Sequence, residues 1–526
     1  MLRHPIPYRA TGRFSPIVSD HVEGEAALSE FYAHRPDREG LSAAMRTRTF
    51  DPATRMVLCD VLRDQYHGIA VGEAVRANLE ALRRNDVLTV TTGHQLCLFM
   101  GPLYVPFKIL NVIRLARELS TDEHNVIPVF WMATEDHDRA EIDHAWLDGA
   151  KVEWPGAPAG AVGRLPLSGI DATVEQAGRV LGIGPHADEL RALLNECYRP
   201  EHTLAHATRL FVHALFGRFG VVIVDGDDPR LKSVFAPMMR EEILNGVTSR
   251  AVHYANERLR PRYQPQAHAR ELNLFLLQGL RRERLEPQGV GFVAHDTGTY
   301  WSVQALLDRL DAAPEEFSPN VLLRPLYQET ILPNIAYVGG GGELAYWLQL
   351  RWVFQAMRVP MPPLVLRTSA AFISTKLADK WRASGLSIAD LFTPKAELEK
   401  RIALEHATFS TSLEAERAEH ARLFGALAER VTAADPTLEA SVRAKEAFSR
   451  KGLDLIERRL VRAAKRQQDD RLRQLGEVHD ALFAHGLAER RDNFMSYYAA
   501  KGPALFDEWL DALDPLDPRF SVLEGD

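Results

Sequence analysis

Four consecutive ionisable residues, Glu135, Asp136, His137 and Asp138, directly follow the apolar run 126–133. An unbroken apolar run of this length is typical of a buried strand of a parallel sheet. Ligands of open α/β sheets bind beyond the carboxyl ends of the strands. Charged groups at such a position are costly to desolvate unless something pairs with them. The stretch therefore predicts chemistry at this strand end.

Three interpretations of this acidic stretch stay open. Asp136 and His137 could form a proton-transfer pair, in which the carboxylate raises the pKa of the imidazole. Alternatively, Glu135, Asp136 and His137 could bind a divalent metal ion together with His144, seven residues beyond His137. The third interpretation is a structural carboxylate–histidine network. We take Glu135, Asp136 and His137 as catalytic candidates and Asp138 as a binding candidate.

A second polar segment, Gly93-His94-Gln95, ends another strand-like run at 87–92. Its polar groups could contact a nucleotide or a substrate carboxylate, and a plain polar loop is the alternative. His94 is a further catalytic candidate, and Gly93 and Gln95 are binding candidates. Lys108, one turn into the helix expected at 107–119, could reach back to a phosphate or be a solvated helix lysine.

Four adjacent glycines lie between a strand-like run at 335–338 and a helix expected to extend to about residue 357. Glycines let backbone N–H groups approach an anion, and a helix N-terminus adds roughly 0.3–1 kcal/mol of favourable field. The pattern lacks the lysine of a P-loop, and a tight turn without a ligand is the alternative. Glu343, directly after the glycines, suits an ammonium group or the N-terminal charge of the helix. The binding candidates here are Gly339, Gly340, Gly341, Gly342 and Glu343.

Arg324 and Asn273 are isolated candidates in mostly apolar surroundings. Arginine suits bidentate recognition of a carboxylate or phosphate, although Glu329 could simply be its ion-pair partner. Asn273 could supply a polar contact. Cys97 lies among Leu96, Leu98 and Phe99, which is typical of a buried apolar thiol and not of a reactive thiolate.

Composition limits the class of protein. A chain of 526 residues predicts two or three domains, and 46% hydrophobic with 25% charged residues is ordinary for a globular protein. A net charge of −8 argues against a general nucleic-acid binder. The three cysteines form no CxxC motif, which fits a reducing compartment. Because no signal-like or membrane-spanning apolar run is present, we expect a cytoplasmic protein.

The pattern of elements predicts an α/β core at residues 1–390. A helical lead-in extends to about residue 85, and insertions are expected at about 145–220 and 240–320. The core sheet is expected to contain the strand-like runs 87–92, 126–133, 221–225, 335–338 and 364–366.

Residues 391–485 are rich in Ala, Glu, Arg and Leu, with apolar residues mostly three, four or seven positions apart. With a turn at 433–436, this pattern predicts two arms of an antiparallel coiled coil. Such a pair is too thin to enclose a core, so we expect it to form a homodimer. The aromatic-rich segment 486–526 is expected to dock on the core.

Several motifs together resemble one family, the cysteine-adding enzymes of bacillithiol biosynthesis. The resemblance covers nearly the whole chain and rests on the segments 91–95, 101–104, 128–131, 135–138, 224–229, 324–329, 339–343 and 346–347. It implies a Rossmann-like parallel-sheet core with two connecting-peptide insertions, followed by a coiled-coil dimerisation domain. Gln328 and Trp347 lie in these motifs and become binding candidates on that basis.

The resemblance also implies a reaction, in which ATP assists the attachment of cysteine to the amine of glucosaminyl-malate. The enzyme would then be a ligase that forms an amide bond, with ATP as its suspected cofactor and no metal firmly implied. Two alternatives stay open: a metal-dependent hydrolase built on the Glu135-Asp136-His137 cluster, and a non-catalytic coiled-coil scaffold that only binds ligands.

Overall fold

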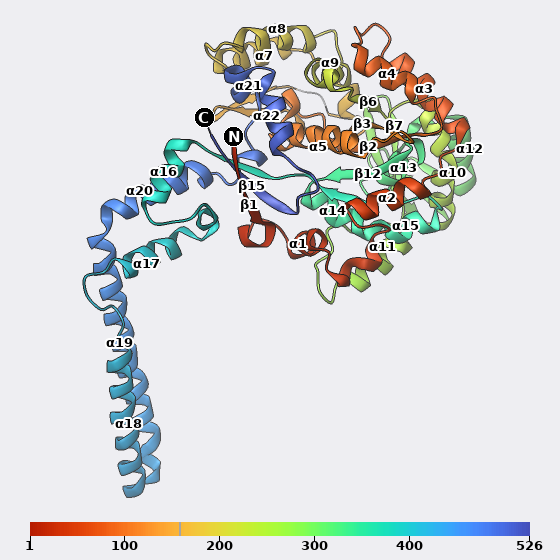
Figure 1. Cartoon of the computed structure of the whole chain (residues 1–526). Coiled ribbons are helices and arrows are strands. Elements are labelled where there is room, and N and C mark those ends of the chain that lie inside the picture. The colour runs from red at the N-terminus through yellow and green to blue at the C-terminus, as the bar shows by residue number, and fades with distance from the viewer. Residues whose placement is uncertain (157–158, 526) are drawn as a thin grey trace. The chain divides into compact units, whose positions relative to one another are not determined.

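A five-stranded parallel sheet forms the centre of the computed structural model, which describes residues 1–156 and 159–525 (Figure 1). The strand order β13-β12-β2-β3-β6 places the first strand of the sheet in its middle, which is the Rossmann order and confirms the predicted fold class. The strands are β2 (Val87–His94), β3 (Asn125–Met132), β6 (Val222–Asp225), β12 (Asn334–Gly339) and β13 (Leu364–Leu366).

Helix α5 (Tyr104–Leu119) crosses from β2 to β3 and packs against both strands. It begins at Tyr104, earlier than the predicted residue 107, because Pro106 is tolerated in the first turn of a helix. Its apolar face joins the core through residues such as Val112 and Leu115. Lys108 and Asn111 are nevertheless buried on the same helix, so polar partners must be present inside the core.

One long segment separates β3 from β6. Its described residues form a hairpin and four α-helices: α6 (Arg139–Ile142), β4 (His144–Leu147), β5 (Ala150–Glu153), α7 (Ile170–Val180), α8 (Ala187–Cys197) and α9 (Leu204–Phe216).

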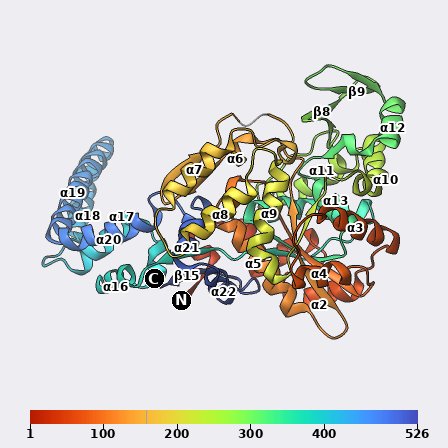
Figure 2. The same ribbon diagram turned by 90° about the horizontal axis from the view of Figure 1, so that it is seen from above.

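A second long segment separates β6 from β12 and has a sheet of its own, of order β10-β9-β8-β7-β11 (Figure 2). Neighbouring strands of this sheet are antiparallel. Its elements are α10 (Pro229–Asn245), α11 (Val247–Leu259), β7 (Leu274–Gln278), β8 (Arg281–Gln288), β9 (Gly291–Ala294), β10 (Tyr300–Ser302), α12 (Val303–Ala312), β11 (Phe317–Pro319) and α13 (Arg324–Ile331).

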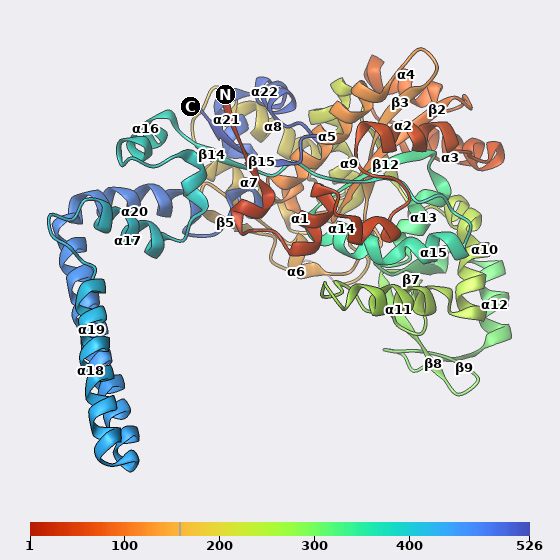
Figure 3. The ribbon, with the colours of Figure 1, turned by 60° about the horizontal axis from the view of Figure 1, so that its bottom comes forward.

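The glycine-rich turn after β12 leads into α14 (Gly341–Trp347) and then α15 (Arg351–Ala356). The N-terminal helix α1 (Pro16–Glu23) packs beside α14 (Figure 3). The N-terminal region therefore contributes to the neighbourhood of this turn.

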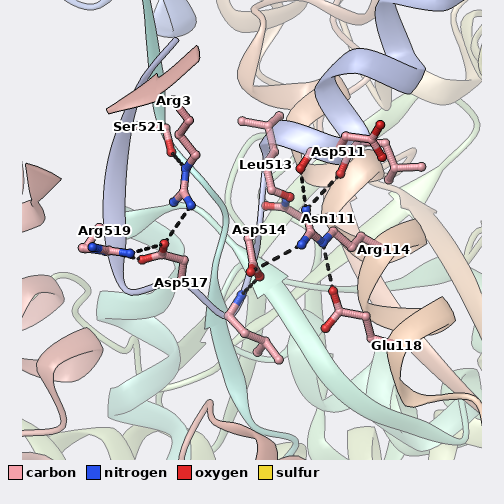
Figure 4. Close-up of polar contacts among 12 residues, drawn as sticks. Arg3, Asn111, Arg114, Glu118, Asp511, Leu513, Asp514, Asp517, Arg519 and Ser521 are labelled. Atoms are coloured by element: carbon pink, nitrogen blue, oxygen red, sulfur yellow. Dashed lines mark hydrogen bonds and ion pairs between the residues drawn. The ribbon is translucent and has the colours of Figure 1, made fainter. Parts of the chain in front are cut away.

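Residues 487–523 return to the core and belong to the same compact unit as residues 3–371. The segment carries α21 (Met495–Lys501) and α22 (Ala504–Ala512), and α22 packs on α5. Arg114 of α5 donates from Nη1 to the carbonyl oxygen of Asp511 at 2.9 Å, and Arg3 pairs with Asp517 at 2.8 Å (Figure 4). The two ends of the chain are thus tied to the core by polar contacts.

The second unit comprises mainly Phe372–Gly486. Its helices are α16 (Thr375–Ala383), α17 (Lys395–Glu405), α18 (Glu414–Ala434), α19 (Glu439–Gln467) and α20 (Asp469–Phe483), and α18 runs along α19 (Figure 1). The unit begins earlier than residue 391 because α16 packs on α20, to which Lys380 is joined through an ion pair with Glu477.

The two predicted arms are not continuous helices. The first is interrupted at 406–413, where the hydroxyl side chains of residues 408 and 410–412 favour turns over helix. The second breaks at Gln468, and Asp469 and Asp470 then supply the first-turn charge of α20. Among the described residues, no helix has both the length and the apolar character needed to cross a membrane.

Glu489 offers a test of how the C-terminal segment is held on the core. Its carboxylate is fully buried and receives both Nη atoms of Arg367, at 3.0 and 3.1 Å, together with the N–H of Ala370 at 2.8 Å. We predict that Glu489→Gln lowers the free energy of unfolding by about 3–5 kcal/mol, because Arg367 is left buried without its anion. Urea unfolding followed by tryptophan fluorescence measures the loss.

The control is Asp507→Asn, which breaks the exposed pair with Arg218 on the same segment. It should cost less than about 1 kcal/mol. Equal effects of the two substitutions would contradict the assigned importance of the buried pair.

Candidate active site

A cavity of about 990 Å³ opens where β2, β3 and β12 end. The direction of strand order reverses between β2 and β12, and such a switch point is the usual ligand site of open α/β sheets. Twelve of the predicted site residues line the cavity: Gly93, His94, Gln95, Lys108, Glu135, Asp136, His137, Arg324, Gly340, Gly341, Gly342 and Glu343.

An ion pair between Lys108 and Glu343 spans the switch point. Lys108 is 2% exposed and donates from Nζ to the carbonyl oxygen of Gly93 at 2.9 Å. Glu343 also accepts the N–H of Gly340 at 2.8 Å and the hydroxyl of Tyr337 at 2.7 Å. Lys108 is therefore not a solvated lysine, and because two of its three N–H donors are engaged, its contact with a phosphate stays a prediction.

The environment holds Glu343 ionised. Burial alone would raise the pKa of its carboxyl, but Lys108 and the two hydrogen-bond donors outweigh burial and lower the pKa to about 2. Burial lowers the pKa of Lys108, and Glu343 opposes that shift. The carboxylate both pairs with an ammonium group and charges the first turn of α14, as the sequence suggested.

Packing explains part of the glycine run. A Cβ atom on Gly339 would lie 2.7 Å from a methyl of Leu344, and one on Gly341 would lie 3.3 Å from Val18. A Cβ on Gly342 would meet nothing within 4 Å. Because Glu343 occupies the N–H of Gly340, the loop offers an anion one donor fewer than expected. Anion binding by this loop stays a prediction.

Asp136 is an ionised carboxylate at the end of β3. Its Oδ1 accepts the N–H of His137 at 2.7 Å, and its Oδ2 accepts from the side-chain amide of Gln95. Arg282 of β8 lies 3.6 Å from Oδ1. Burial raises the pKa of Asp136, but Arg282 and these hydrogen bonds together lower it below its usual value.

The imidazole of His137 is uncharged. Arg282 lies 2.8 Å from the Nδ1 atom of His137, so that nitrogen is the acceptor of an arginine N–H. Burial and Arg282 lower the pKa of the imidazole, although Asp136 opposes them. Asp136 does raise this pKa, as expected, but burial and Arg282 outweigh it, so the net shift is downward.

Glu135 points to a different partner, Lys232 of α10. Lys232 is fully buried, forms an ion pair with Glu135, and donates to the carbonyl oxygen of Phe317 at 2.6 Å. Burial raises the pKa of Glu135, and Lys232 opposes that shift. His144 instead lies 3.1 Å from Asp143.

The metal-site interpretation thus loses its ligand set, because Glu135 pairs with Lys232, His144 with Asp143, and Asp136 and His137 share Arg282. In the described residues, no group of three or more His, Cys, Asp or Glu side chains is arranged to hold a metal ion.

His94 and Cys97 lie together at the end of β2, with Sγ and Nε2 3.7 Å apart. Burial and Lys108 lower the pKa of His94 to about 3, so its imidazole is neutral. Burial raises the pKa of Cys97 to about 12, and its thiol is 3.2 Å from the carbonyl oxygen of Glu141. The prediction of a buried thiol at Cys97 is confirmed.

Arg324 lines the cavity from the start of α13. It donates to the Oε1 of Gln328 at 3.3 Å and to the hydroxyl of Tyr346 at 3.1 Å. The alternative pairing with Glu329 is wrong, because that carboxylate accepts from the amides of Gln328 and Asn334. Within the described part of the chain, no carboxylate lies within ion-pair distance of Arg324.

Five predicted binding residues do not line the cavity. Asn273 belongs to a buried network with Glu242, and Asp138 caps α6 by accepting the N–H of Ala140. Trp347 stacks on Tyr337 with ring centroids 4.2 Å apart. Gln328 accepts a hydrogen bond from Arg324, and Gly339 packs against Leu344.

The cations that pair with the two acidic residues after β3 were not predicted from the sequence. Arg282 and Lys232 come from the second inserted segment, and Arg367, which also lines the cavity, follows β13. Arg367 lies over the ring of Tyr104 at 5.1 Å and pairs with Glu489. No local sequence signal marks Arg282, because residues 281–284 are all charged and resemble a solvated surface.

The fold and the cavity define a class: a Rossmann-like protein with a polar ligand site at its switch point and a C-terminal coiled coil. Two family models match, described as "Bacillithiol biosynthesis BshC, N-terminal Rossmann-like domain" over residues 1–368 and "Bacillithiol biosynthesis BshC, C-terminal coiled-coil domain" over residues 370–525. The chain belongs to this bacillithiol biosynthesis BshC family.

Relatives match along nearly the whole length. A protein of Flavobacterium johnsoniae is 36% identical, with 98% of this chain and 99% of the relative covered. A protein of Christiangramia forsetii is also 36% identical, with 98% of each chain covered. One from Geobacillus thermodenitrificans is 30% identical, with 97% of each covered. All three carry the name "Putative cysteine ligase BshC".

The depressed pKa of Glu343 predicts how stability depends on pH. Since the folded pKa of about 2 lies below the usual 4.5, the ionised group stabilises the fold fully above about pH 4.5. That contribution, about 3 kcal/mol, is lost as the pH falls towards 2. We expect Glu343→Gln to be less stable than the wild type at pH 7, with the difference narrowing at pH 3.

Urea unfolding at the two pH values measures this difference. Glu508→Gln is the control, because Glu508 forms a partly exposed pair with Lys501 outside the cavity. Its difference from the wild type should be small and nearly constant. A difference for Glu343→Gln that does not change with pH would contradict the assigned ion pair.

Proposed function

We propose that this chain is a ligase that joins cysteine to the amine of glucosaminyl-malate through an amide bond, with ATP activating the cysteine carboxylate. Membership of the bacillithiol family and the names of its relatives support the pathway and cysteine as one reactant. The observation that carries the proposal is a single cavity in which ionised Asp136 and uncharged His137 share space with Arg324, a cation that has no carboxylate partner among the described residues.

Glu135 and Asp136 form an acidic wall of the cavity, and this wall suits the amine of the substrate. The amine of glucosaminyl-malate must lose a proton before it attacks, and ionised Asp136 attracts the ammonium form. His137 is neutral, and Arg282 at its Nδ1 leaves Nε2 as the N–H that can face a substrate. As the C–N bond forms and the nitrogen becomes more acidic, Asp136 accepts the proton that the nitrogen loses. General-base assistance of this kind contributes roughly 10²–10⁴-fold to a rate.

Arg324 suits the activated carboxyl group. Its guanidinium forms hydrogen bonds only with uncharged groups, so a substrate carboxylate or a phosphate oxygen can provide the missing negative charge. ATP is a substrate in this scheme: the cysteine carboxylate attacks a phosphorus atom of ATP and releases ADP or pyrophosphate, and the amine then displaces phosphate or AMP from the acyl carbon. The cavity of about 990 Å³ is at the upper end of the usual range for ligand sites, which supports its holding more than one reactant.

The first test of this function is catalysis itself. Purified protein incubated with cysteine, glucosaminyl-malate and ATP should form bacillithiol, detected by mass spectrometry. We predict that Asp136→Asn lowers kcat at least about 10²-fold, because the amide can neither attract the ammonium group nor accept its proton.

Asp138→Asn is the matched control, since Asp138 is two residues away, exposed, and outside the cavity lining. It should keep kcat within about threefold of the wild type. If the wild type binds its ligands but forms no product, the scaffold alternative replaces the ligase.

We also propose that the coiled coil forms a homodimer. Each of its long helices buries a single side chain, Ala428 in α18 and Ala464 in α19. Phe448 and Leu455, seven residues apart on α19, are 78% and 48% exposed. Apolar residues at this spacing on an exposed helix face are typical of a surface that packs against a second coiled coil.

Sedimentation velocity tests the homodimer. We predict that the double substitution of Phe448 and Leu455 by lysine converts a dimer into a monomer, because two charges per chain would be buried in the seam. Arg450→Gln, a change at an exposed polar position of the same helix, should leave the dimer intact. A wild type that sediments as a monomer would rule the homodimer out.

A further inference from the structure

The short strand β11 accepts hydrogen bonds from two buried cations. Lys232 donates to the carbonyl oxygen of Phe317 at 2.6 Å. Arg282 donates to the hydroxyl of Ser318 at 2.9 Å and to the carbonyl oxygen of Pro319 at 2.9 Å. Three consecutive residues of the second inserted segment thus fix the position of both cations.

Each of these cations meets one acid at the end of β3. Lys232 pairs with Glu135, and Arg282 lies 3.6 Å from Asp136. Both acids line the cavity, whereas Lys232 is fully buried and does not. β11 therefore connects the inserted sheet to the acidic wall of the site through charge.

The surroundings of Lys232 contain few negative charges that could balance its own. Glu135 is the one carboxylate within ion-pair distance of it among the described residues. The neighbouring acid Asp227 is already engaged by Arg164, at 2.6 and 2.8 Å. The ring of Tyr327 lies 5.7 Å from Nζ and closes the other side of the ammonium group. The charge of Lys232 is therefore balanced by the carboxylate of Glu135.

We propose that Lys232 is a positioning residue, which holds Glu135 ionised and directed into the cavity from an anchor on β11. Lys232 does not touch substrate. It acts through Glu135, whose free oxygen then attracts the ammonium group of the amine substrate beside Asp136. The inference rests on the proposed function, because it assigns Glu135 to the amine of that reaction.

Kinetics of Lys232→Met, Glu135→Gln and the double variant test the positioning role. Each single variant should lower kcat about 10–10²-fold, with the KM for cysteine changed less than about threefold. The double variant should lie within about threefold of the weaker single variant, because both changes remove the same group. Losses that multiply in the double variant would overturn the proposal.

Thermal unfolding of the same variants provides a readout that does not need activity. Glu135→Gln should lower the Tm of the wild type, since it leaves Lys232 buried without an anion. In the Lys232→Met background the same substitution should leave Tm unchanged or raise it, since it removes an unpaired carboxylate. Equal decreases in both backgrounds would overturn the pairing.

The matched control is Arg240→Met with its partner change Asp311→Asn. Arg240 lies on the same helix as Lys232 and pairs with Asp311 of α12, but in an exposed position outside the cavity lining. These variants should keep kcat within about twofold. If the wild type forms no bacillithiol, the proposed function fails, and the change in sign of the Tm effect alone decides whether Lys232 holds Glu135.

Discussion

The ion pair between Lys108 and Glu343 is the contact on which the site depends. Through Gly93 and Gly340, it joins the end of β2 to the turn after β12, the two strands between which the sheet order reverses. Many Rossmann folds bind phosphate at such a turn. Here a carboxylate occupies it, and a lysine from the next helix neutralises that carboxylate. The carboxylate thus has its ammonium partner before any ligand arrives, whereas Arg324 lines the same cavity without a carboxylate partner among the described residues.

The same arrangement recurs around the cavity. Three of the four acids that line the cavity meet a cation from another part of the chain: Glu343 meets Lys108, Glu135 meets Lys232 and Asp136 meets Arg282. Arg367, which also lines the cavity, is in turn neutralised by the C-terminal Glu489. Burying these charges is tolerable only because each has its partner and further hydrogen bonds. The result is a wall of groups with fixed charge, next to histidines that burial keeps neutral, His94 among them.

The five core strands could be predicted because buried parallel strands appear in a sequence as apolar runs, and ligand sites follow their carboxyl ends. The same rule located His94, Asp136 and Glu343. It could not find Lys232 or Arg282, whose partners are 97 and 145 residues away. No local pattern marks such pairs: Arg282 lies in a run of charges that resembles a solvated surface. Asn273 and Trp347 were predicted to bind a ligand but lie in the core for the opposite reason. A polar or aromatic side chain that packs inside the protein looks the same in a sequence as one that binds a ligand.

The second inserted segment supplies both cations, Lys232 and Arg282, that lie against the acids after β3. The core sheet alone would bring Glu135 and Asp136 together at one strand end, where two carboxylates repel each other and each would favour its protonated form. Arg282 lowers the pKa of Asp136, and Lys232 opposes the effect of burial on Glu135. Both cations are held on β11, far from β3 in the chain. The second inserted segment therefore favours the ionised form of both acids, and a Rossmann core without it would present a less ionised surface at this strand end.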